Sequence, residues 1–425
     1  MTEPSGIIGS GAKAFGRFDY VKITLLGFAL TALWQALHTI ILPIMVQDFV
    51  GDAEKNTYLG LLTFVGLILA MLAQPIAGAI SDRSGFKWGR RRPYILLGCL
   101  LTVVLLSGIG LAPSFIILFT TYCLLQISSN TAQGPYQAFI PELVPEGRRG
   151  TASGVKTLLE IVGGVAVLYP IAILMDNYFA GEGSLWLWAA LTALGVTLLA
   201  VMAATVLMIK EPPAVAAPRQ SLLKTLYKPF KIDIRSHHNF LWFLASRLLV
   251  FMAFATIQQF ALNFLTDVIG VANPAEATAQ FSITAVVGML VVVYPAGRLS
   301  DRFGRKPIGI TAGLLAALGV AIIFMSHSYT AIIVAAGVLG VAVGAFNSTN
   351  WALATDLVAK GEEARYLGLA NVATAGGAAL ARLIGPVIDF FNKATAGLGY
   401  QVMLGACFVY FVAGGLLLLK IKGRH

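Results

Sequence analysis

Charged residues are scarce in this chain of 425 residues, and their scarcity excludes most soluble folds. Only 12% of the residues are Asp, Glu, Lys or Arg, whereas a soluble domain keeps about a quarter of its residues charged. Hydrophobic residues make up 57%, and the mean hydropathy is +0.80. Too little polar surface remains to face water, so the composition indicates that much of the chain contacts lipid.

Cysteine and histidine are also rare, which leaves little basis for a disulfide framework or a metal centre. Cys99, Cys123 and Cys407 are an odd, unclustered set inside apolar runs, where we expect small buried thiols. The adjacent His237 and His238 have no neighbours that would complete a metal or catalytic site. With no nucleophile cluster and no phosphate-binding loop, the sequence predicts no enzyme activity, no metal and no cofactor. The polar, Gly-rich start of the chain does not resemble a cleavable signal.

Long apolar runs are what the chain has instead. Each run reaches the roughly 20 residues that a membrane-spanning helix needs, and short segments containing Gly, Pro or Asp separate them. We therefore predict an all-α membrane protein with twelve transmembrane helices. The runs cover residues 21–49, 57–81, 93–112, 114–140, 150–175, 185–209, 240–266, 277–297, 307–326, 329–356, 365–391 and 397–419.

The basic residues fall on one side of this predicted topology. They crowd into the even-numbered connections and both termini, whereas the odd-numbered connections hold only Lys55 and Lys393. The positive-inside rule places both termini and the even-numbered connections in the cytoplasm, so we expect a multi-pass protein of the inner or plasma membrane. The net charge of +10 fits contact with anionic lipid headgroups and does not require a nucleic-acid partner.

The two halves of the chain are related by a repeat. Asp82 after the second span matches Asp301 after the eighth at an offset of 219 residues, each inside a Gly-x-x-Ser-Asp-Arg segment. Glu142 after the fourth span matches Asp356 after the tenth at an offset of 214, each followed by Leu-Val. An insertion in the loop after the second span accounts for the difference. The repeat predicts two pseudo-symmetric six-helix bundles.

One long polar segment divides these bundles. Its Leu222, Leu223, Leu226 and Phe230 have near-helical spacing, which favours either a short amphipathic helix on the membrane surface or a plain flexible linker. The predicted parts are a cytoplasmic N-terminal tail at residues 1–20, an N-terminal bundle at 21–209, a cytoplasmic linker at 210–239, a C-terminal bundle at 240–419 and a cytoplasmic tail at 420–425.

Segments 78–92 and 297–306 resemble the loop signature of the major facilitator superfamily, Gly-x-x-x-Asp-Arg followed by Gly-Arg-Arg or Gly-Arg-Lys. The signature occurs at both equivalent positions, and the resemblance covers the whole chain. The run from Ser81-Asp-Arg to Gly89-Arg-Arg-Arg-Pro-Tyr94 is similar to the sucrose transporter and glycoside–cation symporter branch and its bacterial relatives. The resemblance implies the major facilitator fold and transport by alternating access, and we expect a functional monomer.

In this superfamily the acid of the loop signature is a gating element, and the resemblance implies the same for Asp82. Asp82 and Asp301 follow the C-terminal ends of helices, where the helix dipole disfavours negative charge, so both need cationic or helix-N-terminal partners. A bond that forms in one conformation and breaks in the other would be a latch; ordinary loop packing is the alternative. The predicted gating set is Asp82, Arg83, Arg90, Asp301, Arg302 and Arg305.

Polar side chains concentrate in the first, fourth, seventh and tenth spans, and polar groups inside a bilayer are costly enough to indicate function. The resemblance implies that these four spans line a central cavity. Neutral amides donate and accept hydrogen bonds, which suits a hydroxyl-rich ligand, and aromatic rings stack on a sugar. Hydrogen bonding between helices is the alternative role. The predicted substrate-binding set is Trp34, Gln35, His38, Asn130, Gln133, Gln137, Arg247, Gln259, Asn263, Asn347, Asn350 and Trp351.

Glu160 is the only acid well inside a predicted span, and Lys156 lies one turn before it on the same helix face. A membrane-embedded carboxylate that can lose its partner is a suitable proton carrier, so we predict this pair as the coupling site; a self-neutralised pair is the alternative. His38 is a second titratable candidate. Arg247 and Arg382 are further intramembrane cations that could bind ligand oxygens or cap neighbouring helices.

These features predict a transporter, a proton-coupled or facilitative importer of a sugar or similar hydroxylated solute. The alternatives are an efflux transporter for amphipathic compounds and a membrane sensor without flux. The span 4 Arg motif and span 5 Gly-Pro motif of drug–proton antiporters are absent. Sodium-coupled relatives in the glycoside–cation symporter group use acids in spans 2 and 4, and neither span interior holds one, so a sodium site of that pattern is not expected.

Overall fold

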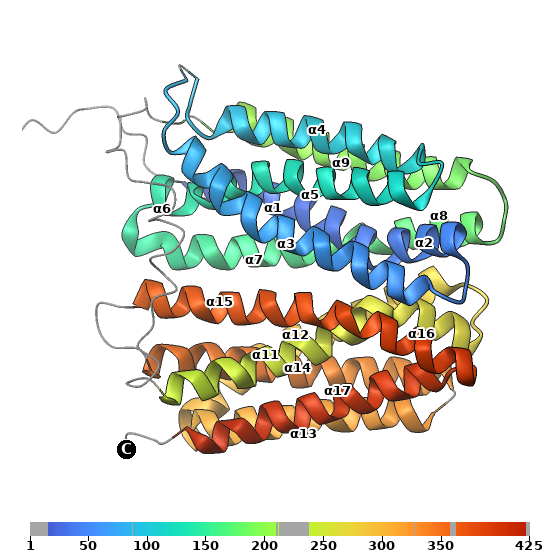
Figure 1. Ribbon diagram of the computed structural model, residues 1–425. Coiled ribbons are helices and arrows are strands. Elements are labelled where there is room, and N and C mark those ends of the chain that lie inside the picture. The colour runs from blue at the N-terminus through green and yellow to red at the C-terminus, as the bar shows by residue number, and fades with distance from the viewer. Residues whose placement is uncertain are drawn as a thin grey trace, which may run out of the picture.

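The computed structural model is a bundle of long helices whose ends gather at two opposite faces (Figure 1). It describes residues 16–86, 88–209, 211, 238–326, 328–357 and 363–421. Twelve helical segments in this part of the chain are long and apolar enough to cross a membrane, which confirms the predicted number. Their limits differ from the predicted ones by a few residues. The predicted amphipathic segment at 222–230 lies outside the described residues.

The helices form two six-span halves. In the N-terminal half they are α1 (Arg17–Ala36), η1 (Leu37–Ile41), α2 (Leu42–Val50), α3 (Lys55–Ser81), α4 (Arg92–Gly110), α5 (Phe115–Gln137), α6 (Phe139–Leu143), η2 (Glu146–Arg148), α7 (Arg149–Ala166), α8 (Leu168–Phe179) and α9 (Leu185–Met208). In the C-terminal half they are α11 (His238–Phe264), η4 (Leu265–Ile269), α12 (Pro274–Phe303), α13 (Arg305–Met325), α14 (Tyr329–Leu357), α15 (Glu363–Leu380), η5 (Ala381–Ile384), α16 (Gly385–Ala394), α17 (Leu398–Leu417) and η6 (Leu418–Lys420).

Two spans are interrupted at corresponding places in the halves. Span 5 breaks between α7 and α8, shortly before Pro170, and span 11 passes through the 3-10 turn η5 before α16, which begins at Gly385-Pro386. A proline lacks the N–H that continues a helix, and its ring crowds the preceding turn. Interrupted helices at matching positions of two repeats are typical of binding regions in membrane carriers. Arg382 lies within the break in span 11.

The outer surface of the bundle is apolar, as contact with lipid requires. Val104 on α4 is 66% exposed and Val291 on α12 is 68% exposed, and exposed apolar surface of this extent marks a membrane-facing side. Between helices, small residues allow close approach. A Cβ at Gly163 of α7 would lie 2.1 Å from the backbone oxygen of Phe28 on α1, so this contact requires glycine.

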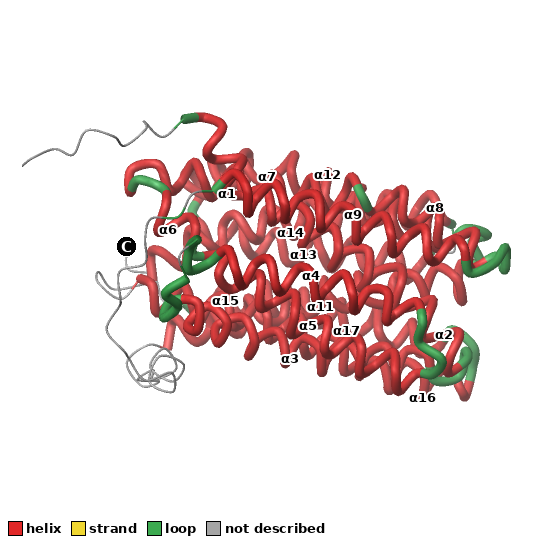
Figure 2. The backbone as a smooth tube through the Cα atoms, turned by 90° about the horizontal axis from the view of Figure 1, so that it is seen from above, coloured by secondary structure: helices red, strands yellow, loops and turns green. Residues whose placement is uncertain are grey.

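The connections lie at the two ends of the bundle (Figure 2). We call the end with the odd-numbered connections the odd face. The end with the even-numbered connections, where α1 begins and η6 ends, is the terminal face. The halves are joined at the odd face. A Cβ at Gly60 of α3 would lie 2.2 Å from the backbone oxygen of Arg382, and one at Gly385 would lie 2.2 Å from that of Asn56. The fully buried Lys55 donates to Asp267 across the halves at 2.7 Å. These contacts close the odd face.

Candidate functional site

A polar cavity of about 290 Å³ lies between the two halves, close to the size range of small-molecule sites. Its wall comes from spans 1, 4 and 5 of the first half and spans 7 and 11 of the second. The lining residues are Gly27, Leu30, Thr31, Trp34, Gln35, His38, Thr39, Gln133, Tyr136, Glu160, Ala255, Gln258, Gln259, Ala378 and Arg382. Five of the predicted substrate-binding residues and the predicted coupling acid Glu160 are therefore in one wall.

His38 occupies η1, a π-helical turn in the middle of span 1, and such turns are frequent at functional sites. The His38 Nε2 atom lies 2.8 Å from the hydroxyl oxygen of Tyr122, which also accepts a hydrogen bond of 2.7 Å from Gln126. The Trp34 ring stacks on the imidazole with centroids 5.1 Å apart. Span 4 thus holds the imidazole in place and leaves Trp34 and His38 at the cavity. Neither Tyr122 nor Gln126 is in the predicted set.

Glu160 and Lys156 form the ion pair that their spacing predicts. The Lys156 Nζ atom lies 3.4 Å from the Glu160 Oε1 atom, one helical turn apart on α7. Gly27 of α1 makes room for this carboxylate, since a Cβ there would lie 2.9 Å from the Glu160 Cγ atom. Tyr136 lies alongside and donates to the Thr24 carbonyl at 2.8 Å. The acid is therefore at a wall where spans 1, 4 and 5 meet, and its coupling role stays a prediction.

Arg382 supplies a cation from the opposite half of the wall. Its side chain is 8% exposed, and its Nη1 atom donates to the Ala378 carbonyl of the preceding turn. Its Nε atom is buried without a hydrogen-bond partner in the described part of the chain. A guanidinium has five N–H donors, and Arg382 lines the cavity, so it is a candidate donor to the oxygen atoms of a ligand.

The predicted residues of span 10 lie elsewhere, with Arg247 of span 7. The Arg247 Nη1 atom donates to Asn350 at 2.6 Å, and its Nε atom donates to Thr374 at 2.8 Å. The Trp351 ring lies 4.7 Å from the guanidinium carbon. Span 10 contributes no lining residue to this cavity among the described residues. The substrate roles of Arg247, Asn350 and Trp351 therefore stay predictions, and their present contacts are with one another.

The remaining predicted amides are spread along the helices. Asn130 is buried and donates to the Gln126 carbonyl at 2.8 Å, whereas Gln137 is exposed. Asn263 donates to Asn56 across the odd face at 2.8 Å, and Asn347 is half-buried. None of these four lines the cavity. Thr31, Thr39, Tyr136, Gln258 and Arg382 complete its polar wall without being in the predicted substrate-binding set.

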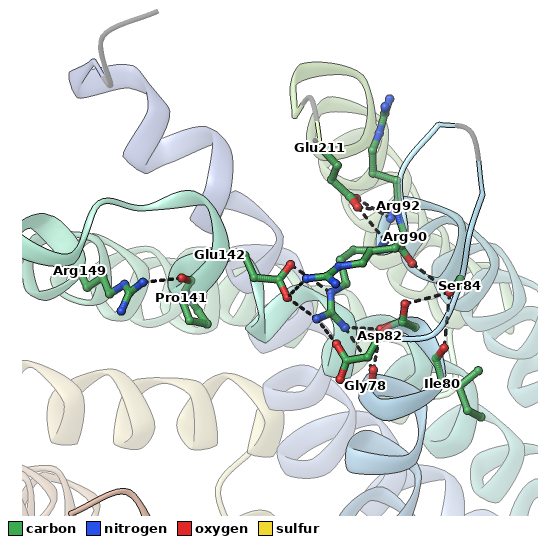
Figure 3. Close-up of polar contacts among 12 residues, drawn as sticks. Gly78, Ile80, Asp82, Ser84, Arg90, Arg92, Pro141, Glu142, Arg149 and Glu211 are labelled. Carbon is green, nitrogen blue, oxygen red and sulfur yellow. Dashed lines mark hydrogen bonds and ion pairs between the residues drawn. The ribbon is translucent and has the colours of Figure 1, made fainter. Parts of the chain in front are cut away.

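Two of the predicted gating residues of the first half, Asp82 and Arg90, lie in a cluster of charged side chains at the terminal face (Figure 3). Its centre is Arg91, which is almost fully buried and donates to the carboxylates of both Asp82 and Glu142 and to the Ser81 hydroxyl at 2.5 Å. Arg90 adds a bond of 2.6 Å to Glu142. Arg83, the next residue, was one candidate partner of Asp82 on sequence grounds, and the structure gives Asp82 a bond from Arg91. Neither Arg91 nor Glu142 is in the predicted gating set.

The two carboxylates keep Arg91 charged. Burial by itself lowers the pKa of the guanidinium, but the hydrogen bonds and charges of Glu142 and Asp82 outweigh burial and leave the pKa above its ordinary value. The Arg91 cation is therefore permanent, and the cluster holds it within the first half.

Glu211, three residues after the end of α9 at Met208, bonds this cluster. Its carboxylate accepts backbone hydrogen bonds from Arg90, Arg91 and Arg92 at 2.7, 2.9 and 2.8 Å. These N–H groups lie at the N-terminus of α4, where carboxylates are stabilised. Gly89, with φ of +123°, makes room, because a Cβ there would lie 2.8 Å from the Glu211 Cδ atom.

The second half repeats the cluster in weaker form. Arg305, which the offset of 214 equates with Arg91, donates to Asp356 at 2.7 Å and lies 3.9 Å from Asp301. Arg302 instead lies over the Phe303 ring. Asp82 and Asp301 thus bond cations of their own halves in this conformation, and a latch function for either stays a prediction.

Replacing Arg91 with Met is expected to lower the free energy of unfolding by about 3 kcal/mol, because two carboxylates lose a buried partner. The matched variant Arg305→Met should lose about 1 kcal/mol, because Arg305 is 28% exposed and holds a solvated pair. Chemical denaturation in detergent micelles measures both. Equal losses of unfolding free energy in the two variants would contradict the expectation that the more buried arginine contributes more to stability.

Comparison with known proteins agrees with this architecture. Two solved structures are similar over nearly the whole chain, which shows the fold. The nucleoside transporter NupG has a TM-score of 0.73 at 14% identity over 95% of this chain and 99% of that one. The D-xylose–proton symporter has a TM-score of 0.70 at 15% identity over 96% and 99%.

Sequence relatives match shorter stretches. Sucrose transport protein SUT1 of Oryza sativa subsp. japonica is 34% identical over 112 residues, 21% of this chain and 21% of that protein. Solute carrier family 45 member 4 of Mus musculus is 31% identical over 170 residues, 36% of this chain and 19% of that protein. The alignments thus span about a fifth of each relative. A sequence model of the MFS/sugar transport protein family matches residues 23–392, and the chain therefore belongs to that family.

Proposed function

We propose that this chain imports a sugar or a similar hydroxylated small solute by alternating access, coupled to protons. The observation that carries the proposal is the cavity between the halves, where amides, aromatic rings and an ion pair share one wall. Family membership and similarity to a sucrose transport protein and to a D-xylose–proton symporter support the substrate class and the coupling ion.

The chemistry of the wall suits a ligand with many hydroxyl groups. Gln35, Gln133 and Gln259 each offer donors and an acceptor without a charge. Trp34 presents an aromatic ring to the cavity, and such a ring packs against the C–H face of a sugar. Arg382 adds a guanidinium to this wall. An amphipathic drug would instead favour an apolar wall.

The positive-inside rule orients the transporter. Basic residues crowd the terminal face, so we assign that face and both chain ends to the cytoplasm of an inner or plasma membrane. The closed odd face is then extracellular. In this orientation the structure represents a state closed to the outside, and uptake requires that the odd face opens while the terminal face closes. We infer that a single chain suffices, because the cavity is formed by its own two halves.

Glu160 is the proposed proton carrier, with Lys156 as its partner in the absence of a proton. Protonation of the acid would release the ion pair, and a bound sugar beside it would favour one of the two states. At the terminal face, Asp82, Arg83 and Arg90 and their equivalents Asp301, Arg302 and Arg305 are the proposed gating residues, with Arg91 as the cation that Asp82 must leave.

Purified protein in proteoliposomes tests this proposal with a panel of neutral sugars, sugar acids and cationic dyes. We expect saturable uptake of a neutral sugar that an inward proton gradient drives above equilibrium and a protonophore abolishes. Protein-free liposomes are the control. Flux of dyes without any sugar would instead establish an efflux transporter of amphipathic compounds, and the absence of any flux would favour a sensor.

A further inference from the structure

Two aspartates at the odd face bond the N-terminus of a helix in the other half. Asp176, at the end of span 5, accepts from the backbone N–H groups of Ala275 and Glu276 at 2.8 and 2.7 Å. These residues are in the first turn of α12. Asp176 is 9% exposed. This contact joins the two halves through a side chain on one and the backbone on the other.

Asp389, at the end of span 11, makes the reciprocal contact. It accepts from the backbone N–H of Thr57 at 2.6 Å and from the side-chain amide of Asn56 at 2.8 Å. Both donors are in the first turn of α3. The Asp389 side chain is 3% exposed. The direction of the contact is reversed: the second half now supplies the carboxylate, and the first half supplies the helix.

The two contacts are equivalent under the internal repeat. Thr57 and Glu276 are 219 residues apart, the offset that also relates Asp82 to Asp301. Asp176 and Asp389 are 213 residues apart, within one residue of the offset of 214, and both lie near the ends of spans that are interrupted at matching places. The same arrangement thus occurs twice. In each case a carboxylate near the end of the fifth span of one half bonds the N-terminus of the second span of the other half.

Each of these contacts combines hydrogen bonds with a favourable interaction between a carboxylate and a helix dipole. The first N–H groups of a helix have no partner within the helix, and that end carries partial positive charge. A carboxylate there makes charge-assisted hydrogen bonds, about twice as strong as neutral ones. When the odd face opens, both carboxylates and their donors must be solvated separately. The exposed Glu54–Lys393 pair at the same face, at 3.2 Å, contributes much less because water screens it.

We propose that Asp176 and Asp389 are gating residues that hold the odd face closed as a pair of symmetry-related helix caps. The proposal rests on the alternating access of the proposed function. It adds a gate at the face opposite the loop signature, and this gate joins carboxylates to backbone rather than to basic side chains. Either cap can be broken singly, so the closed state loses stability in two separable steps.

Spin labels across the odd face test the proposal without transport. Labels at Ser184→Cys and Ala396→Cys lie in exposed connections of the two halves, in a background with Cys99, Cys123 and Cys407 replaced by Ala. Double electron–electron resonance in detergent, without sugar or proton gradient, gives the populations of short and long distances. A failure here leaves the transport assay intact, so the two proposals can fail separately.

Asp176→Asn and Asp389→Asn keep the shape of the side chain and remove its charge. We expect each to raise the ratio of open to closed populations about tenfold, and the double variant about a hundredfold. The control is Asp48→Asn, because the Asp48 carboxylate accepts from Tyr178 of its own half at 2.8 Å; its distances should match the parent. Unchanged populations in monodisperse single variants, or an equal shift in the control, overturn the proposal.

Discussion

Glu160→Gln is expected to abolish uphill accumulation of the sugar while exchange of sugar across the membrane continues. The amide keeps the size and hydrogen-bonding capacity of the acid but cannot carry a proton. A tenfold proton gradient stores about 1.4 kcal/mol and supports about tenfold accumulation at one proton per sugar. In the variant the accumulation ratio should fall to about 1. Proteoliposomes with an imposed proton gradient measure accumulation of the sugar, and counterflow of labelled sugar at equal pH measures exchange.

The geometry explains why exchange should survive. Glu160 lies in the cavity wall with Lys156 at 3.4 Å, and the amide can still pack beside Gly27 and Tyr136. The matched control is Glu182→Gln, an exposed acid in the connection between α8 and α9, which should accumulate sugar as the parent does. Accumulation that persists in Glu160→Gln would show that another residue carries the proton, and His38 is then the next residue to replace.

The terminal cluster shows how far the sequence reaches. The offset of 214 that relates Glu142 to Asp356 also relates Arg91 to Arg305. The repeat could therefore have identified Arg91 as the cation that bonds Asp82. Sequence adjacency made Arg83 only one candidate partner. A residue next to Asp82 at a helix end is close along the chain, but the loop that follows brings a later arginine back onto the carboxylate.

The cavity shows where periodicity stops being informative. Asn130, Gln133 and Gln137 share one helix face by spacing, yet Gln133 lines the cavity, Asn130 is buried and bonded to its own helix, and Gln137 is exposed. Spacing identifies a face, whereas depth along the axis decides what that face meets. The caps of Asp176 and Asp389 could not be predicted from the sequence, because they depend on how the two halves pack. Hydropathy does not encode that packing.

Arg382→Met is expected to weaken sugar binding by about 10- to 100-fold, since a hydrogen bond to a charged group contributes about 1.5–3 kcal/mol. Stability should stay unchanged or rise, because an apolar side chain of similar length replaces a buried cation that has an unpartnered Nε atom. Arg247→Met should behave in the opposite way. Its guanidinium donates to Asn350 and Thr374, and the loss of these charge-assisted hydrogen bonds should lower the free energy of unfolding by about 3 kcal/mol.

The two variants together test whether Arg382 binds the ligand and whether Arg247 holds the fold. Binding is measured by titration of the sugar in detergent, and stability by thermal unfolding of the same samples without sugar. Arg382→Lys restores the charge but not the planar set of donors, so we expect it to recover part of the affinity. Arg382→Met that unfolds as readily as Arg247→Met, with sugar binding retained, would contradict this assignment. Arg382 would then stabilise the packing of span 11 and would not bind the sugar.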